Sequence, residues 1–452
     1  MLGYPVRLMR STLGRKRAQA ASAAAAQWSQ DAKLDPEAIA DSQLRRFNQQ
    51  WEYASTLPFY QQWRKQHDLP DRISTLEELD QWPVLTKDAL RQHEDLVQAT
   101  PGATAVYRTS GSTGKPFSFP RGSAELMEGY ARTWAYRQAH GLKPFDAFVL
   151  TANTLGHQAH TRKGYVEARA KRMAKDIAGN SWTFPGLIAS PEQADAALST
   201  IRRLRPRYLV GYTSALVMIA ERYLNTGAKG LECITHVIPS SETVTPADAE
   251  LLSNLGTVVV EYGAIEAGVI AATMPQPQVQ HGWPIQVLWP WIMLREGSVL
   301  STLSKRVFPL IHYSLGDDLS ASKYGPGGTI LELSAVQGRT RDVIRLATTN
   351  GPEDIRACEL SMLVRNIDGV LSAQVAPTAD DGADIAVVCS KDHRRDAITA
   401  QAKKAMQIHH PGVVPGRVRL RFVQEFVPLA RGKRGVAIDA TRIPTDAPAE
   451  EI

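Results

Sequence analysis

The residues with the clearest chemical potential form the stretch TSGSTGKP at positions 109–116. Gly111 and Gly114 leave the backbone free to adopt positive φ, and without Cβ atoms their N–H groups can approach an anion closely. Hydroxyl donors and a positive charge are supplied by Ser110, Ser112, Thr113 and Lys115. A loop of this composition suits a polyphosphate.

This loop is not of the Walker type. A Walker loop has a longer spacing between its glycines and a Ser or Thr after its lysine, whereas only two residues separate Gly111 from Gly114 and Pro116 follows Lys115. Residues 106–108 and 117–119 alternate apolar with polar, which is the period of half-buried strands. The loop is therefore predicted at the tip of a β-hairpin, where an ordinary mobile turn is the alternative to a phosphate site.

Two further polar clusters follow predicted strands. The first contains Ser241 and Glu242, in the sequence SSE at 240–242. The second is EYGAIE at 261–266, in which the ring of Tyr262 could stack on a planar base and Glu266 could hold Mg²⁺ against phosphate oxygens. Taken singly, a Tyr or Glu at a strand end is more often structural.

Two more positions complete the set of candidates. In PLIHYSLGDD, Asp317 and Asp318 follow a strand and a glycine, where a carboxylate can accept hydrogen bonds from ribose hydroxyls. In PLARGKRG, Lys433 lies next to glycine in a predicted loop tip. A Gly-Asp turn is common and most loop lysines are only solvated, so neither position identifies a site alone.

The elements that must position these residues alternate between strand, turn and helix. Residues 148–152 form a buried-strand run, a strand ends at Gly211 before a helix capped by Thr213 or Ser214, and a helix covers 246–254. This alternation predicts an α/β fold with a large, mainly parallel sheet and binding sites at the strand ends. Earlier in the chain, Ser74 and Thr86 are predicted helix N-caps.

The remaining segments divide the chain into three parts. Residues 1–40 are a basic extension with an alanine run at 23–26, for which a solvated helix is favoured over a transit peptide. Residues 41–340 are predicted to form one large domain, which carries the glycine loop and the polar clusters that follow the strands. Residues 341–452 form a small, mobile α+β domain with helices predicted at 353–365 and 396–407 and strands at 370–376, 384–389 and 418–422.

Composition is that of a globular protein with several domains. The 452 residues are 43% hydrophobic and 22% charged, and no apolar run approaches the roughly 20 residues of a membrane span. The three cysteines, Cys233, Cys358 and Cys389, have no metal-binding spacing and favour a reducing, cytoplasmic location. The net charge of +6 comes without basic motifs interleaved with aromatics, so nucleic acid is not expected as a partner.

Taken in order, TSGSTGKP, YGAIE, LGD, GRTRD and RGKRG resemble the motifs of the adenylate-forming superfamily. The nearer resemblance is to its phenylacetate-CoA ligase-like branch, through STLEELDQWPVLTKDALR, RPRYLVGYTSALVMIA and VIPSSETV. The resemblance covers about residues 42–440. It implies that residues 41–340 are a large multi-sheet domain that binds a nucleotide and a carboxylate, and that residues 341–452 are a small mobile domain carrying the lysine loop. It also implies activation of a carboxylic acid by ATP as acyl-AMP.

The resemblance assigns roles residue by residue. Residues 110–115 would bind the β- and γ-phosphates, Tyr262 would flank adenine, and Glu266 would bind Mg²⁺. Lys433 would join the carboxylate and the α-phosphate, which makes Lys433 and Glu266 the expected catalytic residues. The further expected nucleotide-binding residues are Ser241, Glu242, Gly263, Asp317 at the ribose and Arg339 beside it, and the expected hinge is Asp342.

The sequence departs from the family pattern at two hydroxyl positions, where it has Ile265 and Leu315. It does not identify the carboxylate, although 211–214, 240–241 and Ala264 are expected to line the pocket. Residues 391–434 hold eleven Lys or Arg against three Asp or Glu, which favours an acidic acceptor and hence coenzyme A. The alternatives are an amine acceptor, a carrier protein and a non-catalytic nucleotide-binding member; the oligomeric state is open, with a homodimer as one arrangement.

Overall fold

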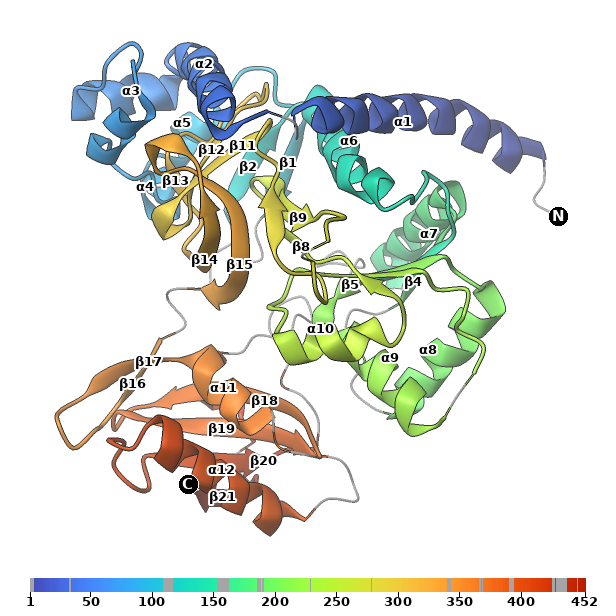
Figure 1. The fold of residues 1–452 in the computed structure, drawn as a ribbon, viewed down its shortest axis with the longest axis vertical. Helices are drawn as coiled ribbons and strands as arrows, with labels where there is room; N and C mark the ends of the chain where they lie inside the picture. The colour runs from blue at the N-terminus through green and yellow to red at the C-terminus, as the bar shows by residue number, and fades with distance from the viewer. Residues whose placement is uncertain are drawn as a thin grey trace.

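A ten-stranded sheet is the framework of the chain in the computed structural model (Figure 1). Its strands lie in the order β14-β15-β10-β9-β8-β6-β5-β3-β4, with β7 paired to β6. The structure describes residues 4–31, 34–108, 117–152, 162–184, 188, 191–227, 229–277, 279–339, 343–365, 367, 369–389, 394–424, 427, 437–444 and 446–452.

The pairing changes direction in the middle of this sheet. It is parallel from β4 through β3, β5 and β6 to β8, and antiparallel from β8 through β9, β10 and β15 to β14. The mainly parallel sheet predicted from sequence is therefore present in one half only, because β8 and β9 are joined by a tight turn. The strands are β3 (Phe148–Thr151), β4 (Ser181–Phe184), β5 (Tyr208–Tyr212), β6 (His236–Ser240), β7 (Thr257–Val258), β8 (Glu261–Ala264), β9 (Gly268–Thr273), β10 (Ile285–Val287), β14 (Asp317–Tyr324) and β15 (Ile330–Arg339).

Helices connect successive strands of the parallel half. They are α7 (Arg162–Gly179), α8 (Pro191–Leu204), α9 (Thr213–Asn225) and α10 (Pro246–Ser253). Every residue of β5 is buried, as expected of a central parallel strand. Gly211 has φ +141, and a Cβ there would lie 2.1 Å from the carbonyl oxygen of Thr151, so this strand end requires glycine.

The two strands predicted on either side of the glycine loop are present. Strands β1 (Ala105–Arg108) and β2 (Ser118–Arg121) pair antiparallel, and α6 (Ser123–Ala139) follows directly. A three-stranded sheet, β11 (Ile292–Arg295), β12 (Val299–Thr302) and β13 (Tyr313–Ser314), leads into β14. The preceding helices are α2 (Pro36–Ala54), α3 (Pro58–His67), α4 (Lys87–Gln92), α5 (Glu94–Gln98) and the 3-10 helix η1 (Leu76–Gln81).

The alanine- and arginine-rich N-terminus forms the expected helix, α1 (Tyr4–Asp31), which runs beside α6 (Figure 1). It is not solvated on all sides. Ala21, Ala24 and Trp28 are buried, and the Trp28 ring stacks on Trp291 with centroids 6.2 Å apart. Small alanines therefore allow α1 to pack closely against its neighbour.

The C-terminal part has its own hydrophobic core, which includes residues from Ile344 to Ile452, whereas the larger core lies between Ala21 and Leu333. Its main sheet has the order β18-β19-β20-β21, and β16 pairs with β17. The elements are β16 (Val343–Leu346), β17 (Glu353–Arg356), α11 (Ala357–Arg365), β18 (Val370–Thr378), β19 (Gly382–Cys389), α12 (Arg395–His409), β20 (Val418–Phe422) and β21 (Ala449–Glu451). The chain thus has the predicted α/β fold class.

Two of the local predictions at helix starts were wrong, and one was confirmed. Residues 353–356 are strand β17 rather than helix, because they pair with β16 and bury Ile355. Thr75, not Ser74, precedes η1, and the Glu78 carboxylate accepts from the N–H groups of both residues. Thr86 does cap α4, since its Oγ1 accepts from Ala89 N.

The start of α9 is capped by a distant residue rather than by Thr213 or Ser214. Tyr212 precedes the helix, and the Glu242 carboxylate accepts from Ser214 N at 2.8 Å. A carboxylate from the turn after β6 therefore binds the positive end of the helix dipole. No helix that the structure describes is long and apolar enough to cross a membrane.

Candidate active site

The β8–β9 hairpin carries the most informative of the predicted residues. Its turn consists of residues 265–267, with Glu266 at the centre. Gly263 permits the two strands to approach, because a Cβ there would lie 2.7 Å from the Gly268 carbonyl oxygen. The turn is closed by Ala267 N, which donates to the carbonyl of Ala264 at 3.1 Å.

The Glu266 carboxylate lies in a protected environment. Its Oε1 is 3.1 Å from Lys87 Nζ and accepts from the Tyr313 hydroxyl at 3.2 Å. The side chain is only 6% exposed. Lys87, the first residue of α4, therefore forms the direct ion pair that a buried carboxylate requires.

This carboxylate suits the predicted metal. Mg²⁺ usually binds one or two protein carboxylates and completes its shell with water and substrate phosphates. Among the described residues, no group of three or more His, Cys, Asp or Glu could hold a metal ion. A single buried carboxylate thus fits a cation that arrives with a polyphosphate, and Lys87 would have to exchange with it.

The two residues predicted at the nucleoside lie in direct contact. The Tyr262 hydroxyl donates to Asp317 Oδ2 at 2.7 Å, although the residues are far apart in sequence. Asp317 begins β14, and its N–H donates to Ser298 Oγ at 3.0 Å. The backbone of Arg339 at the end of β15 is the register partner of Asp317. The predicted aromatic and ribose-binding positions therefore share one place in the fold.

The turn after β6 contains Ser241 and Glu242. Ser241 has φ +69, a conformation that residues other than glycine adopt rarely, and it is exposed. The Glu242 carboxylate is engaged with Ser214 N, as described above. This contact joins the predicted turn to the start of α9. Glu242 therefore has a structural role as the cap of that helix.

A buried polar network is centred on Glu261, the residue that precedes Tyr262 on β8. Glu261 accepts from Ser240 Oγ at 3.1 Å, from Arg137 Nη2 at 3.1 Å and from the Tyr136 hydroxyl. Burial raises the pKa of Tyr136, so that its hydroxyl remains a donor. The network fixes β8 between α6 and β6, at the strand that carries Tyr262.

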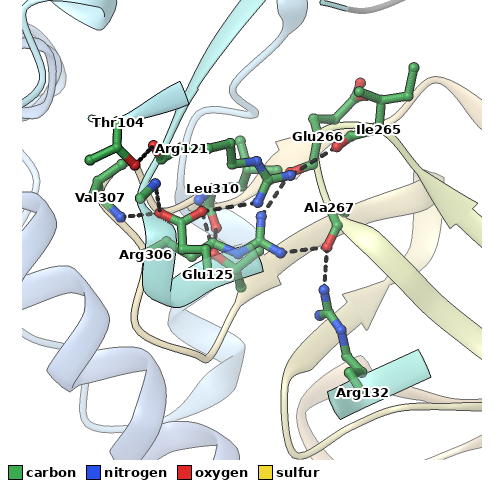
Figure 2. A network of polar contacts seen from close by, with 12 residues as sticks. Thr104, Arg121, Glu125, Arg132, Ile265, Glu266, Ala267, Arg306, Val307 and Leu310 are labelled. Atoms are coloured by element: carbon green, nitrogen blue, oxygen red, sulfur yellow. Dashed lines mark hydrogen bonds and ion pairs between the residues drawn. The ribbon is translucent and has the colours of Figure 1, made fainter. Parts of the chain in front are cut away.

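A second network surrounds the Glu266 turn and consists of Arg121 on β2, Arg132 on α6 and Arg306 before β13 (Figure 2). Figure 2 shows these arginines pointing toward the turn. They are 8%, 2% and 5% exposed, respectively. Burial is the main cause that lowers the pKa of Arg306, and it lowers the pKa of Arg132 to about 10.

Some predicted residues lie outside the described part of the chain. These are the glycine-loop residues Ser110, Gly111, Ser112, Thr113, Gly114 and Lys115, the hinge residue Asp342 and the lysine Lys433. For Arg339 only the backbone is described. Their roles remain predictions.

Several site residues had not been predicted. Tyr313 could have been found, because it precedes Asp317 in HYSLGD. Lys87 follows the N-cap Thr86 in LTKDALR, but nothing in that stretch indicates its partner. The arginines of the second network come from separate segments without a shared motif.

Comparison with known proteins defines the fold. No family model and no curated protein sequence matches the chain. A crystal structure of 2-hydroxyisobutyryl-CoA ligase, in the postadenylation state with 2-HIB-AMP, superposes with a TM-score of 0.66 at 16% identity, over 88% of this chain and 89% of that one. The same ligase with 2-HIB-AMP and CoA, in the thioesterification state, gives 0.52 at 17% identity over 90% of each chain.

A second kind of ligase has a weaker similarity. The anthranilate-CoA ligase AuaEII, in complex with anthranoyl-AMP, gives a TM-score of 0.50 at 15% identity, over 73% of this chain and 65% of that one. At these identities the similarity establishes the fold. The chain therefore has the α/β fold of these two CoA ligases.

Proposed function

We propose that this chain is an ATP-dependent acid–thiol ligase. A carboxylate oxygen attacks the α-phosphorus of ATP, the α–β anhydride bond breaks, and acyl-AMP and pyrophosphate result. A thiol then loses its proton to solvent and its sulfur attacks the acyl carbon, so that AMP leaves with the carboxylate oxygen. This chemistry needs positioning and charge neutralisation rather than a nucleophilic side chain.

The observation that carries the proposal is the convergence of three predicted residues in this fold. Tyr262 and Asp317 share a 2.7 Å hydrogen bond, and Glu266 lies in the turn that follows Tyr262. Tyr262 would flank the adenine, Asp317 would accept from the ribose hydroxyls, and Glu266 would hold Mg²⁺ beside the phosphates. Bound Mg²⁺ would neutralise phosphate charge during adenylation.

The residues outside the described part of the chain complete the proposed machinery. The glycine loop would bind the β- and γ-phosphates, and Lys433 would bind the carboxylate and the α-phosphate. Because Lys433 is needed in only one half-reaction, the part beyond Asp342 would rotate between the two. The different TM-scores of the neighbouring ligase in its two states, 0.66 and 0.52, support more than one arrangement of this fold.

Coenzyme A is the proposed acceptor. The excess of basic residues counted in the sequence at 391–434 overstates the positive charge that is free to attract it. Four described arginines of residues 391–434 are ion-paired, mostly with acids outside that stretch. Arg417 pairs with Asp380 at 2.8 Å, and Asp384 accepts from Arg419 and Arg421 at 2.7 and 3.2 Å. The exposed basic side chains that remain on α12 are Arg395, Lys403 and Lys404. The proposal that the chain is of the phenylacetate-CoA ligase-like subtype rests on the sequence motifs alone.

The proposal is tested by exchange of labelled pyrophosphate into ATP over a panel of carboxylic acids. We expect exchange that requires both Mg²⁺ and one class of acid. Binding of ATP without acid-dependent exchange would instead identify a non-catalytic nucleotide-binding protein.

The acceptor is tested separately with the best acid. We expect a thioester from CoA, at a rate that falls moderately between low and physiological salt because screening weakens attraction to α12. An amide from an amine, with no thioester from CoA, would make the chain an amide-forming ligase and overturn the choice of acceptor.

Tyr262→Phe is expected to raise KM for ATP about tenfold and to change kcat less than about twofold. The ring that would stack on adenine is retained, whereas a hydrogen bond to a charged acceptor, which contributes roughly 1.5–3 kcal/mol, is lost from Asp317. Steady-state kinetics with varied ATP measure both constants.

Tyr324→Phe is the matched control. Tyr324 also lies on β14 and its hydroxyl donates to Glu296 Oε1 at 3.0 Å, but this contact is exposed. KM for ATP should stay at the wild-type value. Equal effects of the two substitutions would remove the support for Tyr262 and Asp317 as a nucleoside site.

A further inference from the structure

The 265–267 turn is held by an unusual concentration of buried positive charge. Its carbonyl oxygens have no partners in the β8–β9 ladder, so a buried turn must obtain donors elsewhere. Arginine side chains supply them from β2, α6 and the segment before β13, which are distant in sequence (Figure 2). The carbonyls belong to Ile265, Glu266 and Ala267.

The hydrogen bonds form an overlapping set. Arg121 Nη2 donates to the first and second carbonyls of the turn, at 2.8 Å each. Arg306 Nη1 donates to the second at 2.8 Å, and its Nη2 donates to the third. Arg132 Nη2 also donates to the third, at 2.7 Å. The second and third carbonyls therefore each have two arginine donors, which together fix the backbone of the turn.

The Glu125 carboxylate anchors this set by hydrogen bonds. Glu125 accepts from Arg121 Nη1 at 3.1 Å, from Gly122 N at 3.2 Å and from Val307 N at 2.5 Å. It therefore holds the first arginine directly and Arg306 through the neighbouring backbone. Arg132 Nε and Nη1 are buried and have no hydrogen-bond partner among the described residues. The cluster thus contains more N–H donors than the carbonyls need.

Such a cluster is costly for folding. Buried guanidinium groups lose their hydration, and apolar side chains of similar volume often stabilise a fold as well or better. A turn that only had to be satisfied could use fewer charges. What the cluster does achieve is a fixed backbone under the carboxylate that faces Lys87 and Tyr313.

We propose that Arg121, Arg132 and Arg306 are positioning residues that hold the Glu266 turn in the geometry required for binding a divalent cation with the nucleotide. This inference rests on the proposed function. Groups that orient a metal ligand typically change metal affinity 10- to 100-fold when they are removed. The arginines act through the backbone and need not touch the nucleotide.

The test is Arg306→Met, with binding of Mn²⁺ measured by electron paramagnetic resonance in the presence of a non-hydrolysable ATP analogue. We expect the Kd for Mn²⁺ to rise about tenfold. The thermal midpoint should shift by no more than about 4 °C, because both affected carbonyls keep an arginine donor and a like charge is removed from beside Arg121 and Arg132. Arg306→Lys keeps the positive charge but can form fewer hydrogen bonds to the turn. The Kd for Mn²⁺ should therefore rise less in this variant, by about threefold.

Arg295→Met is the matched control. Arg295 is also buried, and it donates to the carbonyls of Leu76 and Gly327 rather than to the 265–267 turn. Its loss should lower the thermal midpoint without changing the Kd for Mn²⁺. Unchanged Mn²⁺ binding in Arg306→Met, or an equal rise in Arg295→Met, would overturn the inference.

Two further measurements distinguish the possible outcomes. If Arg306→Met does not fold, Arg306→Lys decides, since wild-type Mn²⁺ binding in that variant would contradict a positioning role. Failure of the proposed function is recognised separately, because the unchanged chain would then show no acid-dependent exchange. If the unchanged chain catalyses exchange but the variants bind Mn²⁺ as the wild type does, the proposed function stands and only the positioning role of the arginines is refuted.

Discussion

Glu266→Gln is expected to lower acid-dependent pyrophosphate exchange by about 10²- to 10³-fold, the scale for removing one preorganised group that stabilises transition-state charge. Glutamine has nearly the same shape and can still accept from Tyr313, so the β8–β9 turn should keep its position. The lost negative charge is the one expected to hold Mg²⁺ beside the phosphates. Exchange rates are measured with the best acid over a range of Mg²⁺ concentrations.

Glu332→Gln controls for loss of a carboxylate from the same sheet. Glu332 lies on β15 and accepts from Gln286 Nε2 at 3.3 Å, apart from the 265–267 turn. Its exchange rate should stay within twofold of wild type. A Glu266→Gln protein with unaltered Mg²⁺ dependence would show that the metal is bound elsewhere.

Lys433→Ala is expected to reduce adenylation by about 10²-fold or more, because one charge donor at the α-phosphate is removed. The second half-reaction should change little when synthetic acyl-AMP is supplied, since Lys433 would have left the cleft by then. Pyrophosphate exchange and thioester formation from acyl-AMP measure the two steps independently.

Two comparisons sharpen this result. Lys403→Ala removes an exposed lysine of α12 in the same part of the chain and should leave adenylation unchanged. Asp342→Pro fixes φ at the proposed hinge and should impair one half-reaction much more than the other. Equal losses of both half-reactions in Asp342→Pro would argue against rotation, and normal adenylation by Lys433→Ala would refute the role of the lysine.

The parts of the site that could be predicted from sequence are those with a local signal. Alternation on either side of the glycine loop identified the β1–β2 hairpin. Tyr262, Glu266 and Asp317 each follow a strand or a short turn, and their types match the chemistry of a nucleotide. Sequence order, however, could not reveal that the Tyr262 hydroxyl contacts Asp317.

The parts that could not be predicted depend on contacts between distant segments. Residues 353–356 become strand because β16 offers a partner, which overrides local helix preference. The start of α9 is capped by Glu242 from the turn after β6, so the local hydroxyl residues Thr213 and Ser214 indicated the wrong cap. Arginine and lysine usually lie on the protein surface. Residue type alone therefore could not reveal that the arginines around the Glu266 turn are buried, or that Lys87 contacts Glu266.

The most direct measurement of the central claim follows the oxygen atoms of the acid. The best acid, labelled with ¹⁸O in its carboxylate, is incubated with ATP, Mg²⁺ and CoA, and the nucleotide products are analysed by mass spectrometry. An acyl adenylate transfers one labelled oxygen from each carboxylate to AMP, so we predict AMP that carries a single ¹⁸O. Unlabelled AMP, or label found instead in inorganic phosphate beside ADP, would contradict activation of a carboxylic acid as acyl-AMP.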